Sequence, residues 1–322
     1  MERPVISVAT TMYNSERCIT AFLHAMTRVL EEIDCAWEIV VVDDGSSDNS
    51  VSVCREIVET DERITLVELS RNFGHEPALL EAMRQTKGDF VFLIDSDLEE
   101  PPDTLFEMLD LLREEVTVDV LYGVQKVRRG TIQHTLLGWL SYRVFNRLSG
   151  VPIPNDVLTV RLMTRRYVDS LLRYNERTIA LAGLFALAGF EQRAIPVEKG
   201  YKGYTSYTFA KRVAVFLRYL IIFTSVPANA ITATGLATAV FAATYAGYVF
   251  GAYWLTTDPV EGWTTLVLLV LFFNGLLLTS VGICAAYLSF IFQEVKGRPV
   301  AIVKENGATR SIAPVPRIKE RI

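Results

Sequence analysis

Short apolar runs alternate with longer amphipathic stretches between residues 5 and 125 of the chain. Runs rich in Val and Ile that are separated by helical stretches are typical of βαβ units, so the pattern predicts an α/β fold with a mostly parallel sheet. The predicted strand segments, two of which hold acidic residues at their ends, are Val5–Thr10, Glu38–Gly45, Ile64–Leu69, Phe90–Asp97 and Val120–Val124. The predicted helices are Ser15–Glu32, Ser47–Val58, Glu76–Gln85 and Pro102–Leu112.

Two long stretches in the last third of the chain contain no Asp, Glu, Lys or Arg. The first stretch, Tyr219–Thr257, is 39 residues long, and the second, Gly262–Gln293, is 32 residues long. Because a helix needs about 20 apolar residues to cross a bilayer, each stretch can hold one span. We expect the spans near Ala230–Leu255 and Trp263–Phe292. A pair of buried core helices is the alternative, but such helices are seldom this long and this free of charge.

The charges around these two stretches predict their orientation. The connection 256–262 holds Asp258 and Glu261 but no basic residue, whereas seven Lys and Arg residues follow the second stretch. By the positive-inside tendency, the connection lies outside and both chain ends lie in the cytoplasm. The first residues lack the pattern of a signal peptide, so we expect the first two thirds of the chain to stay on the cytoplasmic side.

Basic and apolar residues are mixed in the segment before the first span. Lys211, Arg212 and Arg218 punctuate an otherwise apolar stretch. This mixture favours an amphipathic helix in the membrane interface, and a packed helix that happens to precede a span is the alternative. The expected domains are a soluble domain at 1–207, the interfacial helix at 208–228, a two-helix membrane domain at 229–293 and a cytoplasmic tail at 294–322.

Composition narrows the classes of function. Half of the residues are hydrophobic, which excludes an intrinsically disordered chain. The net charge of -5 and the pI near 5.4 argue against a nucleic-acid partner, which usually selects a basic surface. The four cysteines are widely spaced and form no C-x-x-C motif, so a disulfide framework or zinc site is not expected and a reducing compartment fits best.

Acidic residues mark the carboxyl ends of two predicted strands, where ligands bind in sheets of this type. Asp43 and Asp44 follow one strand, and Asp95 and Asp97 follow another. Carboxylates two residues apart can face one divalent cation of the Mg²⁺ or Mn²⁺ type, although acids here can also cap the next helix. Two acidic strand ends facing one crevice favour a cation or ribose hydroxyls between them. The first strand is not followed by a dinucleotide fingerprint of the G-x-G-x-x-G type.

Four motifs in a fixed order resemble a known family. They are Thr10–Asn14, Val41–Asp48, Ser70–His75 and Ile94–Pro102. They are similar to family 2 glycosyltransferases of GT-A fold, and more narrowly to polyprenyl-phosphate glycosyltransferases such as dolichol-phosphate mannosyltransferases and bactoprenol glucosyltransferases. The two charge-free stretches and Glu294–Pro299 extend this similarity over nearly the whole chain.

The resemblance implies a reaction and a set of site residues. One sugar would move from a UDP- or GDP-linked donor to undecaprenyl or dolichyl phosphate, with inversion, at the cytoplasmic face of a bacterial inner membrane. Asp95 and Asp97 would hold Mg²⁺ or Mn²⁺ on the donor pyrophosphate, and Asp43 or Asp44 would contact the nucleoside. The other expected donor-binding residues are Thr11, Tyr13, Asn14, Asn72 and Ser96. The expected catalytic residues are Asp97, Asp156 and Arg161.

One position departs from the family pattern. Many relatives hold an Asp two residues before the Arg of a Gly-Asp-Phe-Arg-Leu segment, but here Thr159 precedes Arg161 and the nearest carboxylate is Asp156. Either Asp156 takes a similar role through a shifted loop, or no carboxylate base is used. A phosphate monoester has a second pKa near ~6, so a polyprenyl phosphate is already anionic at pH 7. A sugar hydroxyl would need a general base, so the departure favours a phosphate acceptor.

Basic residues on either side of this region are candidates for binding the acceptor phosphate. They are Arg128, Arg129, Lys199 and Lys202. A solvated basic turn or attraction to lipid headgroups is the alternative for them, and a structural ion pair with a buried acid is the alternative for Arg161. We expect His75 at a loop or helix start near the nucleotide, without a ligand role. A glycan or glycerolipid acceptor, a catalytically silent binder of nucleotide sugar or lipid, and a homo-oligomer also stay open.

Overall fold

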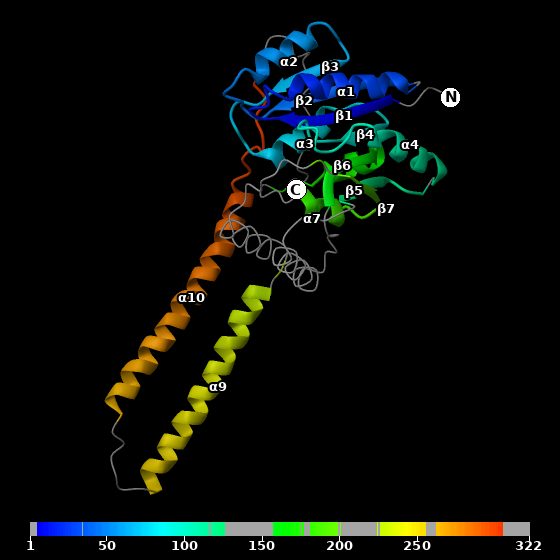
Figure 1. Cartoon of the computed structure of the whole chain (residues 1–322). Coiled ribbons are helices and arrows are strands. Elements are labelled where there is room, and N and C mark those ends of the chain that lie inside the picture. The colour runs from blue at the N-terminus through cyan, green and yellow to red at the C-terminus, as the bar shows by residue number, and fades with distance from the viewer. Residues whose placement is uncertain are drawn as a thin grey trace, which may run out of the picture.

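The structure, a computed structural model of the chain, describes residues 5–33, 35–115, 117–125, 157–174, 176, 181–198, 200, 224, 226–255 and 262–304. An α/β domain forms one end of the molecule, and two long helices extend from it side by side (Figure 1). The order of the elements along the chain explains this division, because the βαβ units come first and the long helices come last.

Within the described residues, the sheet has seven strands in the order β3-β2-β1-β4-β6-β5-β7. β6 is antiparallel to both β4 and β5, and the other neighbours are parallel. The prediction of a mostly parallel α/β sheet is therefore confirmed. The strands are β1 (Val5–Met12), β2 (Ala36–Asp43), β3 (Ile64–Glu68), β4 (Phe90–Leu93), β5 (Val120–Gln125), β6 (Val157–Thr164) and β7 (Gln192–Val197).

The helices of the domain cover both faces of this sheet. In β2, Ile39 and Val41 belong to one buried cluster, whereas Val40 and Val42 belong to the other, because side chains alternate along a strand. The first cluster contains α1 (Ile19–Glu32), α2 (Ser50–Val58) and α4 (Thr104–Glu114). The second cluster contains α3 (His75–Gln85), α6 (Arg165–Leu171) and α7 (Leu181–Leu187).

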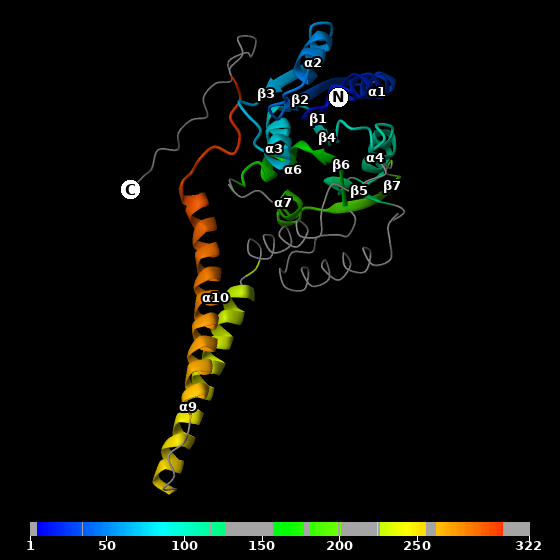
Figure 2. The same ribbon diagram turned by 60° about the vertical axis from the view of Figure 1, so that its left-hand side comes forward.

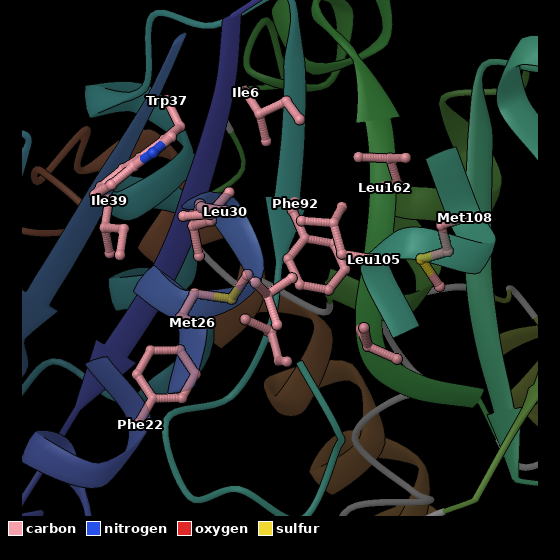
Figure 3. Packing of buried hydrophobic residues seen from close by; sticks show 14 of the residues in the cluster. Ile6, Phe22, Met26, Leu30, Trp37, Ile39, Phe92, Leu105, Met108 and Leu162 are labelled. Carbon is pink, nitrogen blue, oxygen red and sulfur yellow. The ribbon is translucent and has the colours of Figure 1, made fainter. Parts of the chain in front are cut away.

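The first cluster shows how one such layer is built. Phe22, Met26 and Leu30 follow one another at helical spacing along α1 and point to the sheet, where Phe92 of β4 lies opposite them (Figure 3). All four residues are fully buried. The sequence predicted this helix from Ser15, but α1 begins at Ile19. The residues before it form a turn in which the Cys18 N–H donates to the Ser15 carbonyl at 3.0 Å.

The two long helices are α9 (Val226–Leu255) and α10 (Trp263–Val295). In the described part of the chain, Phe272–Val295 is long and apolar enough to cross a membrane, with a mean hydropathy of 2.0 and none of it buried in the protein. The apolar segment of α9, Ala228–Ala242, is shorter. Most of the predicted interfacial segment 208–228 lies outside the described residues.

Candidate active site

A cavity of about 440 Å³ opens at the carboxyl ends of the parallel strands. Its walls come from the end of β1 and the loop that follows it, the residue after β2, the loop between β3 and α3, and the loop after β4. Strands that run in parallel end at the same edge of a sheet, which is why loops distant in sequence meet here. The lining residues are Thr11, Met12, Tyr13, Ser15, Asp44, Asn72, Gly74, His75, Asp95, Ser96 and Asp97.

Most of the predicted donor-binding residues line this cavity, and two do not. The Asn14 side-chain oxygen accepts the Ser47 N–H at 2.9 Å, so it joins the β1 and β2 loops. The Asp43 carboxylate accepts the N–H groups of Gly45 and Ser46, each at 3.1 Å, within its own turn. Sequence reasoning missed Met12, Ser15 and Gly74, which carry no chemical signal of their own. It placed His75 at a loop or helix start, and His75 is the first residue of α3.

Asp43 is buried below the cavity. Its residue is 3% exposed, and this burial raises the pKa of the Asp43 carboxyl above its ordinary value. Hydrogen bonds from Ser46 and Gly45 act in the opposite direction, and the nearby Glu68 adds to the rise. These contacts give Asp43 a structural role in shaping the turn after β2.

Asp44 faces the cavity and also holds the loop between β3 and α3. One carboxylate oxygen accepts the Phe73 N–H at 2.7 Å, and the other accepts the Gly74 N–H at 3.0 Å. Hydrogen bonds to an ionised acceptor are about twice as strong as neutral ones, so this carboxylate is a firm anchor for the loop. Of these two neighbouring acids, Asp44 lines the cavity and Asp43 does not, and the contact of either with a nucleoside stays a prediction.

Gly45 lets the two loops approach closely. A Cβ built on Gly45 would lie 2.6 Å from both the Arg71 carbonyl carbon and the Asn72 nitrogen. Its φ of +72° is a backbone conformation that glycine adopts at low cost. The turn after β2 and the loop before α3 therefore pack backbone against backbone, and only glycine fits between them.

The loop after β4 brings its acids to the opposite wall of the cavity. His75 Nε2 lies 3.4 Å from Asp95 Oδ1, and His75 Nδ1 lies 3.3 Å from the Thr11 hydroxyl. The Ser96 hydroxyl donates to the Thr11 carbonyl at 2.6 Å. Asp97 Oδ1 accepts the Glu99 N–H at 3.0 Å. These contacts connect the end of β1, the start of α3 and the loop after β4, and they fix where the carboxylates of the Asp-Ser-Asp segment lie.

Asp95 and Asp97 fit a divalent cation that is shared with a ligand. Both carboxylates line the cavity and offer the hard oxygen donors that Mg²⁺ and Mn²⁺ prefer. Among the described residues, no group of three or more His, Cys, Asp or Glu could hold a metal ion by itself. Mg²⁺ is commonly bound by one or two carboxylates together with substrate phosphates and water, so a pair of acids is sufficient when a pyrophosphate completes the site.

Arg161 lies in β6 opposite Leu93 of β4, and it is not among the residues that line the cavity. It is 4% exposed, and its guanidinium carbon lies 3.6 Å from the centre of the Phe185 ring. Burial lowers the pKa of Arg161 to about 10, which leaves it charged at neutral pH. Tyr167 and the buried Glu100 act in the opposite direction on this pKa. Glu100 also accepts the Thr159 N–H at 3.0 Å, so the position that departs from the family pattern is tied to the Asp-Ser-Asp loop.

Five predicted site residues lie outside the described residues, and their roles remain predictions. They are Asp156, Arg128, Arg129, Lys199 and Lys202.

Comparisons with known proteins identify the family of the chain. The family model for glycosyl transferase family 2 matches residues 7–172, which contain every residue that lines the cavity. A Mycobacterium tuberculosis protein named as a glycosyltransferase is 33% identical over 93% of this chain and 87% of its own length. The bactoprenol glucosyl transferase of the SfII prophage in Shigella flexneri is 25% identical over 94% of this chain and 98% of its own length.

Solved structures show a more distant likeness. The glucosyl-3-phosphoglycerate synthase of Mycobacterium tuberculosis, in complex with UDP, is 18% identical, with a TM-score of 0.45 over 68% of this chain and 78% of its own. The family match spans more than half of the chain and the Mycobacterium relative is similar over nearly all of it. The chain belongs to glycosyl transferase family 2 and is a glycosyltransferase with an α/β, GT-A-like fold.

Proposed function

We propose that the protein transfers a single sugar from a UDP- or GDP-linked donor to polyprenyl phosphate, at the cytoplasmic face of a membrane. The proposal rests on one observation: the same chain holds both a candidate active site and a pair of long apolar helices. A cavity with paired carboxylates lies in the α/β domain, and a pair of long apolar helices follows it. The relatives named bactoprenol glucosyl transferases match along both parts, which supports a lipid acceptor.

The donor would lie across the cavity. The nucleoside would contact the β1 and β2 side, where Thr11, Tyr13 and Asp44 lie, and the pyrophosphate would reach the Asp-Ser-Asp segment. Asp95 and Asp97 would hold Mg²⁺ or Mn²⁺ there, and the cation would screen the charge of the leaving nucleoside diphosphate. The His75 contact with Asp95 would keep that carboxylate turned into the cavity.

The acceptor phosphate would attack the anomeric carbon directly and invert its configuration. A polyprenyl phosphate, with a second pKa near ~6, is largely anionic at neutral pH and so brings its own nucleophile. The Thr159 position fits this chemistry, because Thr159 uses its N–H on Glu100 and has no carboxyl group to act as a base. Binding of the phosphate by Arg128, Arg129, Lys199 or Lys202, and a part for Asp156 or Arg161, belong to the same proposal.

The two long helices would anchor the site to its lipid. α9 and α10 have 30 and 33 residues, and large apolar side chains such as Phe241 and Leu278 are exposed on them. Exposed apolar surface of this extent is favourable in lipid and costly in water. We therefore propose two spans with both chain ends and the α/β domain in the cytoplasm, and an interfacial helix before the first span.

The proposal is tested with the purified full chain, radiolabelled UDP- and GDP-sugars, and Mg²⁺ or Mn²⁺. Three acceptors are compared: undecaprenyl phosphate, undecaprenol as its matched control without phosphate, and diacylglycerol. We expect label to enter the organic phase from one donor, and only with undecaprenyl phosphate. Label on diacylglycerol or undecaprenol would contradict the phosphate acceptor, and absence of label with every acceptor would contradict transfer to a lipid.

A second arm of the same assay tests the metal. Because the cavity offers two carboxylates to a shared cation, EDTA is expected to abolish labelling and added Mg²⁺ or Mn²⁺ to restore it. Full activity in EDTA would remove the metal from the proposal without removing the acceptor.

A further inference from the structure

After α10 the chain returns to the α/β domain and pairs with an edge of the sheet. The segment Val300–Lys304, called here the return segment, lies beside β3, the edge strand of the sheet (Figure 2). Leu69 and Val303 form an antiparallel bridge. The Ser70 N–H donates to the Ile302 carbonyl at 2.8 Å, and the Lys304 N–H donates to the Glu68 carbonyl at 2.7 Å. The return segment is therefore joined to the end of β3 by a single β-bridge with two backbone hydrogen bonds.

Side chains reinforce this pairing. Val300, Ala301 and Val303 pack against the buried cluster on the α3 side of the sheet. Lys304 Nζ lies 3.5 Å from Glu68 Oε2, and Glu68 is also paired with Arg55. Ile302, by contrast, is 48% exposed. Two backbone hydrogen bonds, an apolar contact and a partly buried ion pair together make this a specific docking contact, of the kind made when a strand is added to a sheet edge.

The docking site adjoins the donor cavity. Ser70, which donates to the return segment, begins the loop 70–74 that leads into α3, and Asn72 and Gly74 of this loop line the cavity. Hydrogen bonds to other parts of the domain hold both ends of this loop, and Gly45 packs against its middle. Asp44 binds its far end through Phe73 and Gly74, and the return segment binds its near end through Ser70.

We infer that the return segment is a positioning element for donor binding, and that it ties α10 to the donor cavity. α10 ends at Val295, so only residues 296–299 separate the apolar helix from the return segment. A short connection of this kind restricts where the domain can lie relative to the helix. Release of the return segment would free the near end of the loop and weaken the wall formed by Asn72 and Gly74. The identity of the donor in this inference rests on the proposed function. The positioning role of the return segment rests on the contacts described above.

Two successive residues of the return segment, whose side chains lie on opposite sides, supply a matched pair of variants. Val303→Asp places a charge against the buried cluster, whereas Ile302→Asp places the same charge on the exposed side. In Val303→Asp we expect the donor KM and the Kd for the matching nucleoside diphosphate, UDP or GDP, to rise by about 2- to 30-fold, with a smaller change in kcat. We expect faster amide hydrogen exchange in residues 70–74. Ile302→Asp should match the wild type in donor KM, in nucleotide Kd and in amide exchange.

A second variant separates loss of docking from general damage. Residues at a bridge without mutual hydrogen bonds have Cα atoms about 4.5 Å apart, which is within reach of a disulfide. In Leu69→Cys/Val303→Cys, nucleotide affinity should be weak when the pair is reduced and should return to the wild-type value when it is oxidised. Val303→Asp with wild-type nucleotide affinity and loop exchange would overturn the inference, and so would an affinity that does not respond to oxidation.

Binding and exchange are measured without acceptor, so they do not depend on the acceptor assignment. A wild type that binds UDP or GDP but labels no lipid would contradict the proposed function, while the variants would still test the positioning role.

Discussion

At the scale of single residues, the two neighbouring acids at the end of β2 make different contacts. Asp43 binds the turn that follows it, whereas Asp44 lines the cavity and binds the loop before α3. The sequence predicted that one of them would face the donor but could not choose between them. Successive side chains at a strand end point in opposite directions, and which direction meets the cavity is decided by the packing of other loops.

The same limit explains the other differences in the site. Asn14 was predicted in the donor site from its motif, but the structure uses its side chain to bind Ser47. Thr11 and Asp95, in contrast, were predicted and line the cavity. Residue type indicates which contacts a side chain can make. The surrounding structure determines whether the side chain makes those contacts with a ligand or within the protein.

Asp44→Asn tests the anchoring role of this carboxylate. The substitution removes the charge that accepts the Phe73 and Gly74 N–H groups, and hydrogen bonds to charged groups contribute about 1.5–3 kcal/mol each. We expect amide exchange at residues 72–74 to accelerate and nucleotide affinity to fall by about tenfold or more, at 1.4 kcal/mol per factor of ten. Unchanged exchange at these amides would show that Asp44 does not hold the loop.

At the scale of elements, hydrophobic periodicity predicted the first five strands and four helices within a few residues of their observed bounds. β6 and β7 were not predicted. β6 runs antiparallel between β4 and β5, and both of these partners lie well before it in the chain. Local pattern indicates that a segment suits a strand, but pairing direction depends on contacts that are distant in sequence.

Two glycines with similar backbone conformations test how loops are packed at the cavity. Gly45 and Gly189 have φ of +72° and +71°, but only Gly45 has atoms within 4 Å of a built Cβ. We expect Gly189→Ala to cost about 1–2 kcal/mol from its backbone conformation alone. Gly45→Ala should cost about 1–3 kcal/mol more, because the methyl group would overlap the Arg71–Asn72 backbone.

Thermal unfolding of the two glycine variants gives the comparison directly, with nucleotide binding as a second readout. Gly45→Ala should melt at a lower temperature than Gly189→Ala and bind nucleotide more weakly. Equal melting temperatures would mean that the close approach of the two loops is absent in solution.

At the scale of the whole molecule, the α/β domain and the pair of long apolar helices are connected at two places. The chain leaves the α/β domain toward α9 and returns from α10 to the edge of β3. The sequence predicted a tail after residue 294 but gave no sign that its first part pairs with the sheet, because Leu69 and Val303 are far apart in the chain. The helical hairpin is therefore attached to the α/β domain at both of its ends.

The central claim is that the carboxylates of the Asp-Ser-Asp segment serve sugar transfer to polyprenyl phosphate. Its most direct test is the rate at which labelled sugar enters undecaprenyl phosphate with wild type, Asp97→Asn and Asp110→Asn, all as the full chain in lipid vesicles. Asp110, on α4, has a side chain that is 75% exposed and serves as the matched control.

We predict wild-type labelling by Asp110→Asn and a loss of about 100-fold or more in Asp97→Asn, with equal insertion of all three into the vesicles. Labelling by Asp97→Asn at the wild-type rate would contradict the account.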